Sequence, residues 1–362
     1  MFNLWLYELA AIYLAVIQVS GAHRLSPTVP RHRKCPPFPG GDFTINQYQL
    51  YPENAIWNPD DCVVYFSALF NGSISVFTPF PSPSPGNSGP LPSITFANLT
   101  LTPGRHVSGL YYSRPTNQLS VVVNSPNPFL TGGADVSGDN LVVRYAPRAA
   151  RELWRANLTA ATRGAFGGFL DVAVDDRPGE GHAYVVGSYP ASILRVDPRG
   201  RRVEVWYPPS GPTTVRGFSG VAIAGDALLV AGMRAVYRFD LRARGRRVPV
   251  LLGRVEGETN RVVLPEAYGG KVMLVSQQAI GATVFRSRDG RWRTAENLGT
   301  VRSDFPRELE RIVPSSVQIG PKRQYLVGQY FPGETVPGTM AGNRSEFPMF
   351  DITAEIETLL RG

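Results

Sequence analysis

The stretch from Tyr51 to Phe77, YPENAIWNPDDCVVYFSALFNGSISVF, carries the clearest pattern of strands and turns in the chain. Ala55 to Trp57 predicts a short inner strand. Residues 58–61, Asn-Pro-Asp-Asp, predict a turn because each of these residue types favours turn conformations. Cys62 to Phe70 is rich in β-branched and aromatic residues, which is typical of a second strand.

Two more strands follow the same pattern. Asn71 and Gly72 form a dipeptide that favours a tight turn. Ser73 to Phe77 alternates small polar and apolar residues, as a half-exposed strand does, and Ser93 to Leu101 is expected to be a fourth strand. Four short antiparallel strands of this kind make one blade of a β-propeller.

The rest of the chain contains looser copies of this pattern. Their inner strands are expected to start near residues 53, 106, 169, 219, 261 and 314. This spacing is close to the roughly 40 to 50 residues that a blade commonly needs. Phe43 to Tyr51 alternates as a strand before the first blade and could complete the last one. The sequence therefore predicts an all-β fold, a six-bladed β-propeller with a central channel.

Composition agrees with a globular chain and argues against a nucleic-acid partner. The 362 residues are 43% hydrophobic and 18% charged, with a net charge of +8 and a pI near 9.6. Lysine occurs only at Lys34, Lys271 and Lys322, so the positive charge is almost entirely arginine. The basic runs are short and lie at predicted turns, which is typical of solvated loops. We expect no nucleic-acid binding.

The first residues predict a targeting segment. Leu9 to Val19 is an apolar run shorter than the roughly 20 residues that span a bilayer, and Ser20-Gly21-Ala22 follows it as a small-residue cleavage site. The segment before the run contains Glu8 and no Lys or Arg, which is unusual for a leader. We expect residues 1–22 to be a signal peptide, 23–42 a basic Pro-rich lead-in and 43–362 the propeller, with no stable membrane span.

Other features indicate the secretory route and a secreted or lumenal protein. Four Asn-X-Ser/Thr sequons are candidate glycosylation sites, at Asn71, Asn98, Asn157 and Asn343. The only cysteines, Cys35 and Cys62, are expected to form a disulfide in an oxidising compartment, with a buried pair of free thiols as the alternative.

Propeller topology brings the beginnings of the inner strands and the loops after the second strands to one face, where such folds commonly place a site. The residues expected there fall into two groups. Candidate catalytic residues are Glu53, His106, Arg261 and Gln277. Candidate substrate-binding residues are Phe70, Phe169, Asp171, Tyr189, Phe218 and Tyr330.

The residue types available exclude several kinds of chemistry. Beyond the lead-in, His106 and His182 are the only histidines, no nucleophile-elbow motif surrounds any serine, and no dinucleotide fingerprint occurs. We expect no cofactor. Glu53, Asn54 and Asp171 could bind Ca²⁺ through oxygen ligands, which leaves a calcium-dependent lactonase of the gluconolactonase type as an alternative. The matching positions of later blades carry no carboxylates, so no metal is the preferred prediction.

Several blocks resemble a known family. YPENAIWNPDDCVVYFSALFNGSISV, SGDNLVVRYAP, ELWRANLTA, GGFLDVAV and YVVGSYPASILRV occur in this order. Together they resemble a fungal family encoded in secondary-metabolite clusters, over Tyr48 to about Leu360. The family includes the fourteenth protein of the trichothecene cluster and the intermolecular hetero-Diels–Alderases of tropolone sesquiterpenoid pathways, of the eupenifeldin, pycnidione and xenovulene type.

The resemblance implies a six-bladed propeller without a redox cofactor. The function that we expect is a cofactor-independent pericyclase that joins a polyketide-derived tropolone quinone methide to a humulene-type terpene. Such a reaction needs two apolar partners held in register, exclusion of water, and a hydrogen-bond donor where negative charge develops on oxygen. A trichothecene-type cyclase, a calcium-dependent hydrolase or lactonase, and a non-catalytic secreted binding protein are the alternatives.

Overall fold

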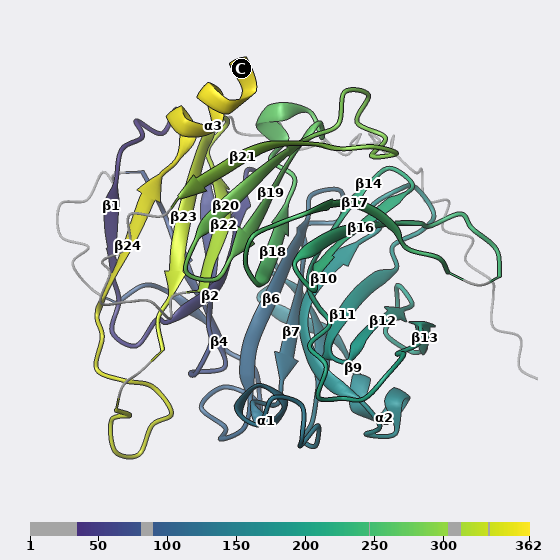
Figure 1. Cartoon of the computed structure of the whole chain (residues 1–362). Coiled ribbons are helices and arrows are strands. Elements are labelled where there is room, and N and C mark those ends of the chain that lie inside the picture. Colours follow the sequence, from purple (N-terminus) through teal and green to yellow (C-terminus); the bar gives the residue numbers. More distant parts are fainter. Residues whose placement is uncertain (1–34, 81–89, 246, 303–312, 332–333) are drawn as a thin grey trace, which may run out of the picture. The chain divides into compact units, whose positions relative to one another are not determined.

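The computed structural model describes residues 35–80, 90–245, 247–302, 313–331 and 334–362. Within the compact unit Lys34–Gly362 it contains six four-stranded antiparallel sheets arranged as the blades of a propeller (Figure 1). This confirms the predicted all-β, six-bladed fold. Each blade runs outward in sequence order from its inner strand, except the last.

The strands are short, as expected for propeller blades. Blade one has β2 (Pro52–Asn58), β3 (Val63–Ala68), β4 (Ser73–Phe77) and β5 (Ser93–Ile94), and blade two has β6 (His106–Ser113), β7 (Gln118–Asn124), β8 (Leu141–Ala146) and β9 (Arg151–Asn157). Blade three has β10 (Gly167–Val174), β11 (Ala183–Tyr189), β12 (Ala191–Val196) and β13 (Val203–Tyr207), and blade four has β14 (Phe218–Ala224), β15 (Ala227–Gly232), β16 (Ala235–Asp240) and β17 (Val250–Arg254). Blade five has β18 (Thr259–Val263), β19 (Val272–Gln277), β20 (Gly281–Arg286) and β21 (Glu296–Arg302), and blade six has β22 (Val313–Ile319), β23 (Arg323–Gln329), β24 (Glu346–Asp351) and β1 (Phe43–Asn46). The helical segments are α1 (Asn127–Leu130), α2 (Leu158–Thr162), the 3₁₀ turn η1 (Glu266–Tyr268) and α3 (Thr353–Arg361).

The ring closes through the N-terminal strand, as the sequence predicted. β1 pairs antiparallel with β24, with Phe43 opposite Met349 and Asn46 opposite Glu346. The last blade is therefore built from both ends of the propeller sequence. This pairing covers a strand edge that would otherwise be open, and it couples the first and last blades.

The hydrophobic core lies between the blades. Six buried apolar clusters occur, each formed by side chains of two adjacent blades. The Val-, Leu- and Phe-rich strand faces supply these clusters, and full burial of one such side chain contributes about 1.5–3 kcal/mol. Because every blade packs against two neighbours, the ring positions the inner strands around the channel.

Two predicted outer strands differ from the structure. In blade one, β5 is only Ser93–Ile94, whereas a strand to Leu101 was expected. Phe96 and Leu99 are instead buried against the next blade, and the Thr100 hydroxyl donates a hydrogen bond to the Gly72 carbonyl at 2.9 Å. These contacts hold residues 95–102 in turns.

The residues from Trp292 to Leu298 predict the outer strand of blade five, but β21 begins at Glu296. Trp292 is fully buried, and its indole N–H donates to the Gly270 carbonyl at 2.9 Å. The residue therefore anchors the loop before the strand. For blade four the sequence pattern predicts only three strands, up to Leu241, whereas the structure adds an outer strand, β17.

The predicted disulfide is present. Cys35 is bonded to Cys62, with 5.5 Å between their Cα atoms. The bond joins the segment before β1 to the turn between β2 and β3. It therefore links the chain that enters the last blade to the first blade. It is also consistent with an oxidising compartment. The predicted signal peptide, residues 1–22, lies outside the described residues and stays a prediction.

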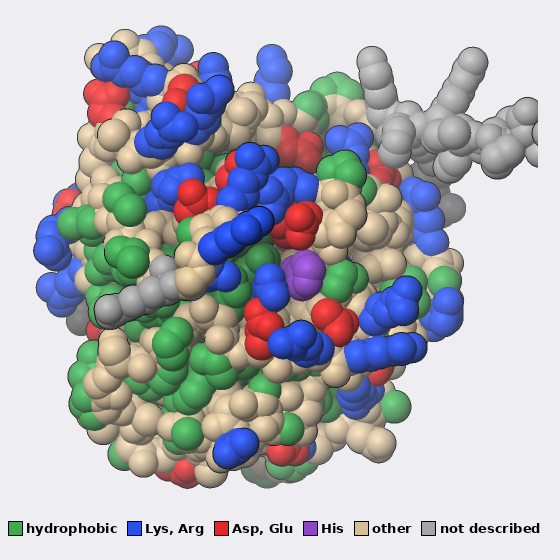
Figure 2. Space-filling model, turned by 90° about the vertical axis from the view of Figure 1, so that its right-hand side faces the viewer, with side chains coloured by type: hydrophobic (Ala, Val, Ile, Leu, Met, Phe, Trp, Pro, Cys, Tyr) green, Lys and Arg blue, Asp and Glu red, His purple; other side chains and the backbone are tan. Residues whose placement is uncertain are grey.

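Charges of both signs mix on the surface. Figure 2 shows one side of the molecule, on which Lys and Arg side chains lie next to Asp and Glu side chains. Ion pairs of this kind include Arg195 with Glu204 at 2.7 Å and Arg242 with Asp226 at 2.8 Å. This side therefore has no continuous basic surface. Among the helices of the described residues, none is long and apolar enough to cross a membrane.

We expect the disulfide to contribute to the stability of the ring. Replacing both Cys35 and Cys62 with Ser should lower the free energy of unfolding by about 2–4 kcal/mol, because the bond restricts the unfolded chain. Urea unfolding of the oxidised wild type and the double variant measures this difference. Reduced wild type is the matched control, and equal midpoints for all three proteins would contradict the prediction.

Candidate functional site

The channel carries a pocket on each face of the propeller. The first, named here the His106 pocket, lies where the inner strands begin and has a volume of about 260 Å³. The second, named here the Trp57 pocket, lies where the inner strands end and has a volume of about 220 Å³. Adjacent residues of the same inner strands line the two pockets, so they lie back to back along the channel.

The His106 pocket is lined by eight apolar or aromatic and seven polar or charged side chains. The walls come from the beginnings of inner strands and from the loops after second strands, including α1. Its lining residues are Glu53, Leu69, Phe70, His106, Asn124, Pro126, Phe129, Leu130, Leu170, Tyr189, Arg216, Asn260, Gln278, Gln329 and Phe331. Aromatic rings order the walls, because Phe70 packs edge-on against His106 at 5.2 Å and Phe129 against Tyr189 at 5.6 Å, measured between ring centroids. A small apolar molecule could be held here with its polar atoms directed to few donors.

Burial determines the protonation of two groups in this pocket. Glu53 is 6% exposed, and burial together with the nearby Asp171 carboxylate raises its pKa well above the usual range. Burial also lowers the pKa of His106 to about 4. The imidazole is therefore neutral near neutral pH, and burial favours the protonated form of the Glu53 carboxyl group. Glu53 Oε2 and His106 Nε2 have no hydrogen-bond partner within the described part of the chain.

A row of β-bulges places the side chains of the channel. The pairing register shifts in β2 between Pro52 and Ala55, in β6 between Val107 and Leu110, and in β18 between Thr259 and Val262. Similar shifts occur in β10 and β14. Bulges bend a strand and redirect its side chains. Glu53, Asn54 and Arg261 all lie within these shifts.

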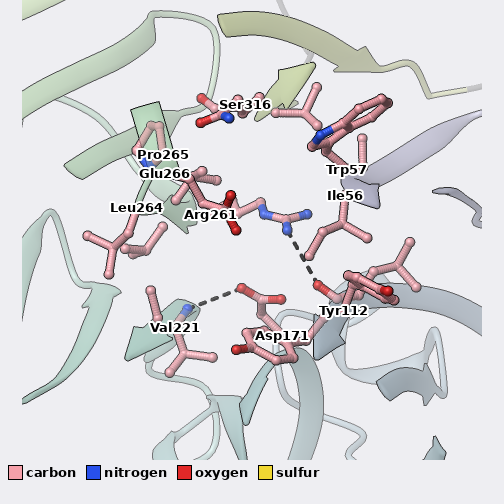
Figure 3. Close-up of a pocket in the computed structure, with 18 of the residues that line it drawn as sticks. Ile56, Trp57, Tyr112, Asp171, Val221, Arg261, Leu264, Pro265, Glu266 and Ser316 are labelled. Carbon is pink, nitrogen blue, oxygen red and sulfur yellow. Dashed lines mark hydrogen bonds between the residues drawn. The ribbon is translucent and has the colours of Figure 1, made fainter. Parts of the chain in front are cut away.

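A charged layer separates the two pockets. It consists of Glu53, Asn54, Asp171 and Arg261, all at most 7% exposed. Asn54 Nδ2 donates to Asp171 Oδ1 at 3.5 Å. The Val221 N–H donates to Asp171 Oδ2 at 3.1 Å (Figure 3). Burial raises the pKa of Asp171 to about 6, although Arg261 opposes this shift. The guanidinium of Arg261 therefore interacts with two carboxyl groups whose pKa values are both raised by burial.

Glycines on neighbouring strands make room for this layer. A Cβ atom at Gly109 would lie 2.5 Å from the Cα atom of Asp171, and one at Gly220 would lie 2.8 Å from the Cα atom of Arg261. Such distances are shorter than real Cβ contacts, so any larger residue would push the strands apart. Gly109 and Gly220 thus fix how closely the strands approach at the two charged residues.

The structure distributes the sequence-predicted residues between the two faces. Glu53, Phe70, His106 and Tyr189 line the His106 pocket. Asp171 and Arg261 line the Trp57 pocket, with the guanidinium of Arg261 directed into it (Figure 3). The predicted donor Arg261 and the predicted donor His106 therefore serve different pockets.

The remaining predicted residues are not among those lining either pocket. Phe169 and Phe218 are buried in interblade clusters, where they pack against neighbouring strands. Gln277 is fully buried, and its side chain bonds to the Gly257 N–H at 2.8 Å and to Thr283 Oγ1 at 2.5 Å. Tyr330 lies 3.7 Å under the guanidinium of Arg344. These positions differ from the expectation that the four residues face the channel.

Sequence reasoning missed other residues of the His106 pocket. Asn124 ends β7 and donates from Nδ2 to Ser108 Oγ and to the Phe169 carbonyl, each at 2.9 Å, while its Oδ1 has no partner in the described structure. Phe129 and Leu130 enter from α1. Loops that follow second strands are expected on this face, and the loop at 126–139 is one of them. No other feature of the sequence pointed to Phe129 and Leu130.

All four sequons lie on the face of the His106 pocket. Asn71 follows β3, Asn98 lies between β5 and β6, Asn157 ends β9, and Asn343 lies between β23 and β24. Asn98, Asn157 and Asn343 are exposed, whereas Asn71 is half-buried and its Nδ2 donates to the Gln49 carbonyl at 3.2 Å. Glycosylation stays a prediction, and its glycans would surround this pocket.

The described residues contain no group of three or more His, Cys, Asp or Glu side chains placed to hold a metal ion. Glu53, Asn54 and Asp171 do lie together, as the calcium alternative requires. However, the Arg261 guanidinium interacts electrostatically with both carboxyl groups. A Ca²⁺ ion bound there would be repelled by this fixed positive charge.

Curated relatives cover nearly the whole chain. Trichothecene biosynthesis protein 14 of Trichoderma arundinaceum is 31% identical over 353 residues, which is 91% of this chain and 92% of that protein. Core trichothecene cluster (CTC) protein 14 of Fusarium sporotrichioides is 29% identical over 349 residues, which is 90% of this chain and 88% of that protein.

Solved structures support the fold. The Malassezia sympodialis major allergen Mala s 1 superimposes with a TM-score of 0.68 at 20% identity, covering 86% of this chain and 96% of the allergen. At this identity the likeness shows the fold alone. No family model matches the chain.

We expect the buried carboxyl of Glu53 to make stability depend on pH. Because its pKa is raised in the folded state, its contribution to stability is complete below the unfolded value of about 4.5 and is lost as pH rises toward the folded pKa. Glu53→Gln removes this loss, so the variant should gain stability relative to wild type with rising pH, by about 1.4 kcal/mol per unit of pKa shift.

Thermal unfolding of both proteins across this pH range measures the change. Asp171→Asn is the matched variant, and its gain should be confined to the window between 3.8 and about 6. A difference between Glu53→Gln and wild type that does not vary with pH would show that Glu53 titrates normally.

A second prediction concerns the close approach at Gly109. Gly109→Ala should destabilise the protein by about 1–3 kcal/mol, because the added methyl group overlaps the backbone of Asp171. Gly167→Ala is the control, since its nearest neighbouring atom is 3.1 Å away and the strain should be smaller. Chemical denaturation compares the two variants, and equal losses would rule out a special constraint at Gly109.

Proposed function

Because the chain belongs to the family of trichothecene biosynthesis protein 14, we propose that it catalyses a cofactor-independent ring closure in secondary-metabolite biosynthesis. The reaction is placed in the His106 pocket. The observation that supports it is the combination, in one pocket, of a buried carboxyl group with a raised pKa and a neutral imidazole, each with an atom that has no hydrogen-bond partner among the described residues.

The first candidate is an intermolecular hetero-Diels–Alder cycloaddition between a polyketide-derived tropolone quinone methide and a humulene-type terpene. Its new C–C and C–O bonds form together, so no nucleophile or redox group is required. The apolar walls hold the two partners in register and exclude water. Negative charge develops on the quinone methide oxygen, and the Glu53 O–H is a suitable donor to it.

The aromatic walls would determine which faces of the two substrates meet. Phe70 and Tyr189 belong to separate pairs of edge-on rings, with His106 and Phe129 respectively. Such pairs restrict ring orientation. This assigns to Phe70 and Tyr189 the shaping role that the sequence had also suggested for the buried Phe169 and Phe218.

The second candidate is a ring closure within one molecule, of the trichothecene type, favoured by the names of the relatives. Here Glu53 would give its proton to a departing oxygen, while the lone pair of neutral His106 would take the proton of an attacking hydroxyl group. One C–O bond forms as another breaks, and water leaves. General acid and base catalysis of this kind contributes typically about 10²–10⁴-fold.

We expect purified protein to accelerate the cycloaddition of a generated tropolone quinone methide with humulene derivatives and to steer its products, without added cofactor. Heat-inactivated protein is the control. Glu53→Gln keeps a donor but weakens it, and Glu53→Ala should lower the rate by about 10–1000-fold. Unchanged rate and product ratio across this substrate class would exclude the cycloaddition.

His106→Gln separates the two candidates, because the amide donates a hydrogen bond but is not a base. The variant should retain most of the activity if the reaction is a cycloaddition and lose about 100-fold or more if His106 acts as a base. Phe70→Leu and Tyr189→Leu should change the product ratio more than the rate. Activity that is lost in EDTA and restored by Ca²⁺ would instead favour the lactonase alternative.

A further inference from the structure

The Trp57 pocket has the features of a second small-molecule site. Its walls come from the last residues of the inner strands and from the turns that follow them, as Figure 3 shows for Ile56, Trp57, Tyr112, Leu264 and Pro265. The cavity measures about 220 Å³. These side chains present aromatic and aliphatic surface on opposite sides of the opening, so the pocket suits a compact apolar molecule.

Arg261 provides the polar end of this pocket. Its side chain is 7% exposed and reaches into the cavity from β18 (Figure 3). Nη2 donates to the Leu110 carbonyl at 3.4 Å, but Nε and Nη1 have no partner among the residues that the structure describes. A buried donor without an acceptor costs about 1–3 kcal/mol, and more when it is charged. An oxygen atom of a ligand could satisfy these donors.

The neighbouring charges decide which kind of oxygen fits. Asp171 lines the same pocket, and its carboxylate already offsets part of the positive charge of Arg261. A ligand carboxylate placed against Arg261 would also approach Asp171 and be repelled by it. A carbonyl oxygen accepts the same hydrogen bonds without this repulsion.

The mouth of the pocket shows no preference for anions either. Arg114 and Glu266, which line it, lie 3.9 Å apart as an ion pair, and Arg114 Nε donates to Asp60 Oδ1 at 3.2 Å. The positive charge of Arg114 is therefore offset by two carboxylates, and no excess of positive charge draws an anion to the entrance. A neutral molecule enters without crossing a strong field.

We propose that the Trp57 pocket binds a neutral, apolar small molecule that carries a carbonyl group, and that Arg261 donates hydrogen bonds to the carbonyl oxygen. The site lies across the charged layer from the His106 pocket and does not depend on the function proposed for that pocket.

Three probes of equal ring size test the proposal: naphthalene, 2-acetylnaphthalene and 2-naphthoate. Calorimetric titration near neutral pH should show 2-acetylnaphthalene binding most tightly. Arg261→Met should weaken its binding by about tenfold or more, which corresponds to one lost hydrogen bond to a charged donor, and should leave naphthalene unchanged. A probe in this pocket should change the fluorescence of Trp57, and this change should be absent in the Trp57→Phe variant.

Two variants keep the test independent of folding. Arg261→Met leaves two buried carboxyl groups without their positive partner, so its unfolding midpoint is measured alongside. Leu264→Trp fills the pocket without touching the charged layer and should abolish binding of all three probes. Tyr189→Leu, in the opposite pocket, should leave their binding unchanged.

Several results would overturn the proposal. Tighter binding of 2-naphthoate than of the ketone would identify an anion site. Equal affinity of the ketone for wild type and a folded Arg261→Met variant would remove the role of Arg261. Loss of binding in Tyr189→Leu but not in Leu264→Trp would move the ligand to the His106 pocket, and no binding of any probe would mean that ordered water alone satisfies Arg261.

Discussion

The close approach of the inner strands around the channel axis is the constraint on which both pockets depend. Interblade packing forces these strands together, and little room remains for side chains where they converge. β-Bulges in five of the inner strands absorb the crowding, because each adds a residue and bends its strand. At this level Gly109 and Gly220 face Asp171 and Arg261. The geometry that closes the ring thus also directs a few polar side chains into the channel.

Those polar side chains form an electrostatic system in which burial outweighs charge pairing. Arg261 lowers the pKa values of both Glu53 and Asp171, yet both values are raised because desolvation is the larger effect. The pair of carboxyl groups also opposes double ionisation, since each would repel the other. Burial therefore favours the protonated form of Glu53, which can donate a hydrogen bond. Without Arg261, both carboxyl groups would be expected to stay neutral over a wider pH range.

The sequence predicted the features that depend on local residue types and on order along the chain. The strand and turn signals of Tyr51–Phe77 identified a blade, and the alternation from Phe43 identified the strand that closes the ring. The disulfide was predicted from two cysteines and the expected oxidising compartment, and the 5.5 Å between their Cα atoms fits the bond. Phe169 and Phe218 were misplaced because a register shift of one residue reverses which face a side chain takes. Bulges leave little trace in a single sequence, so the division of Glu53 and Arg261 between two pockets could not be predicted.

The same shift explains how one channel can hold two chemically different environments. Along β18, Asn260 lines the His106 pocket and the next residue, Arg261, lines the Trp57 pocket. Along β10, Leu170 and Asp171 divide in the same way. A regular strand would alternate these side chains between the channel and the blade, whereas the bulge turns consecutive residues toward the channel at different depths. The charged layer thus separates a pocket that contains a buried carboxyl group with a raised pKa from one whose polar end is a guanidinium. Glu53, Asp171 and Arg261 interact electrostatically. Replacing a charged side chain that lines one pocket is therefore expected to shift the pKa of a group that lines the other.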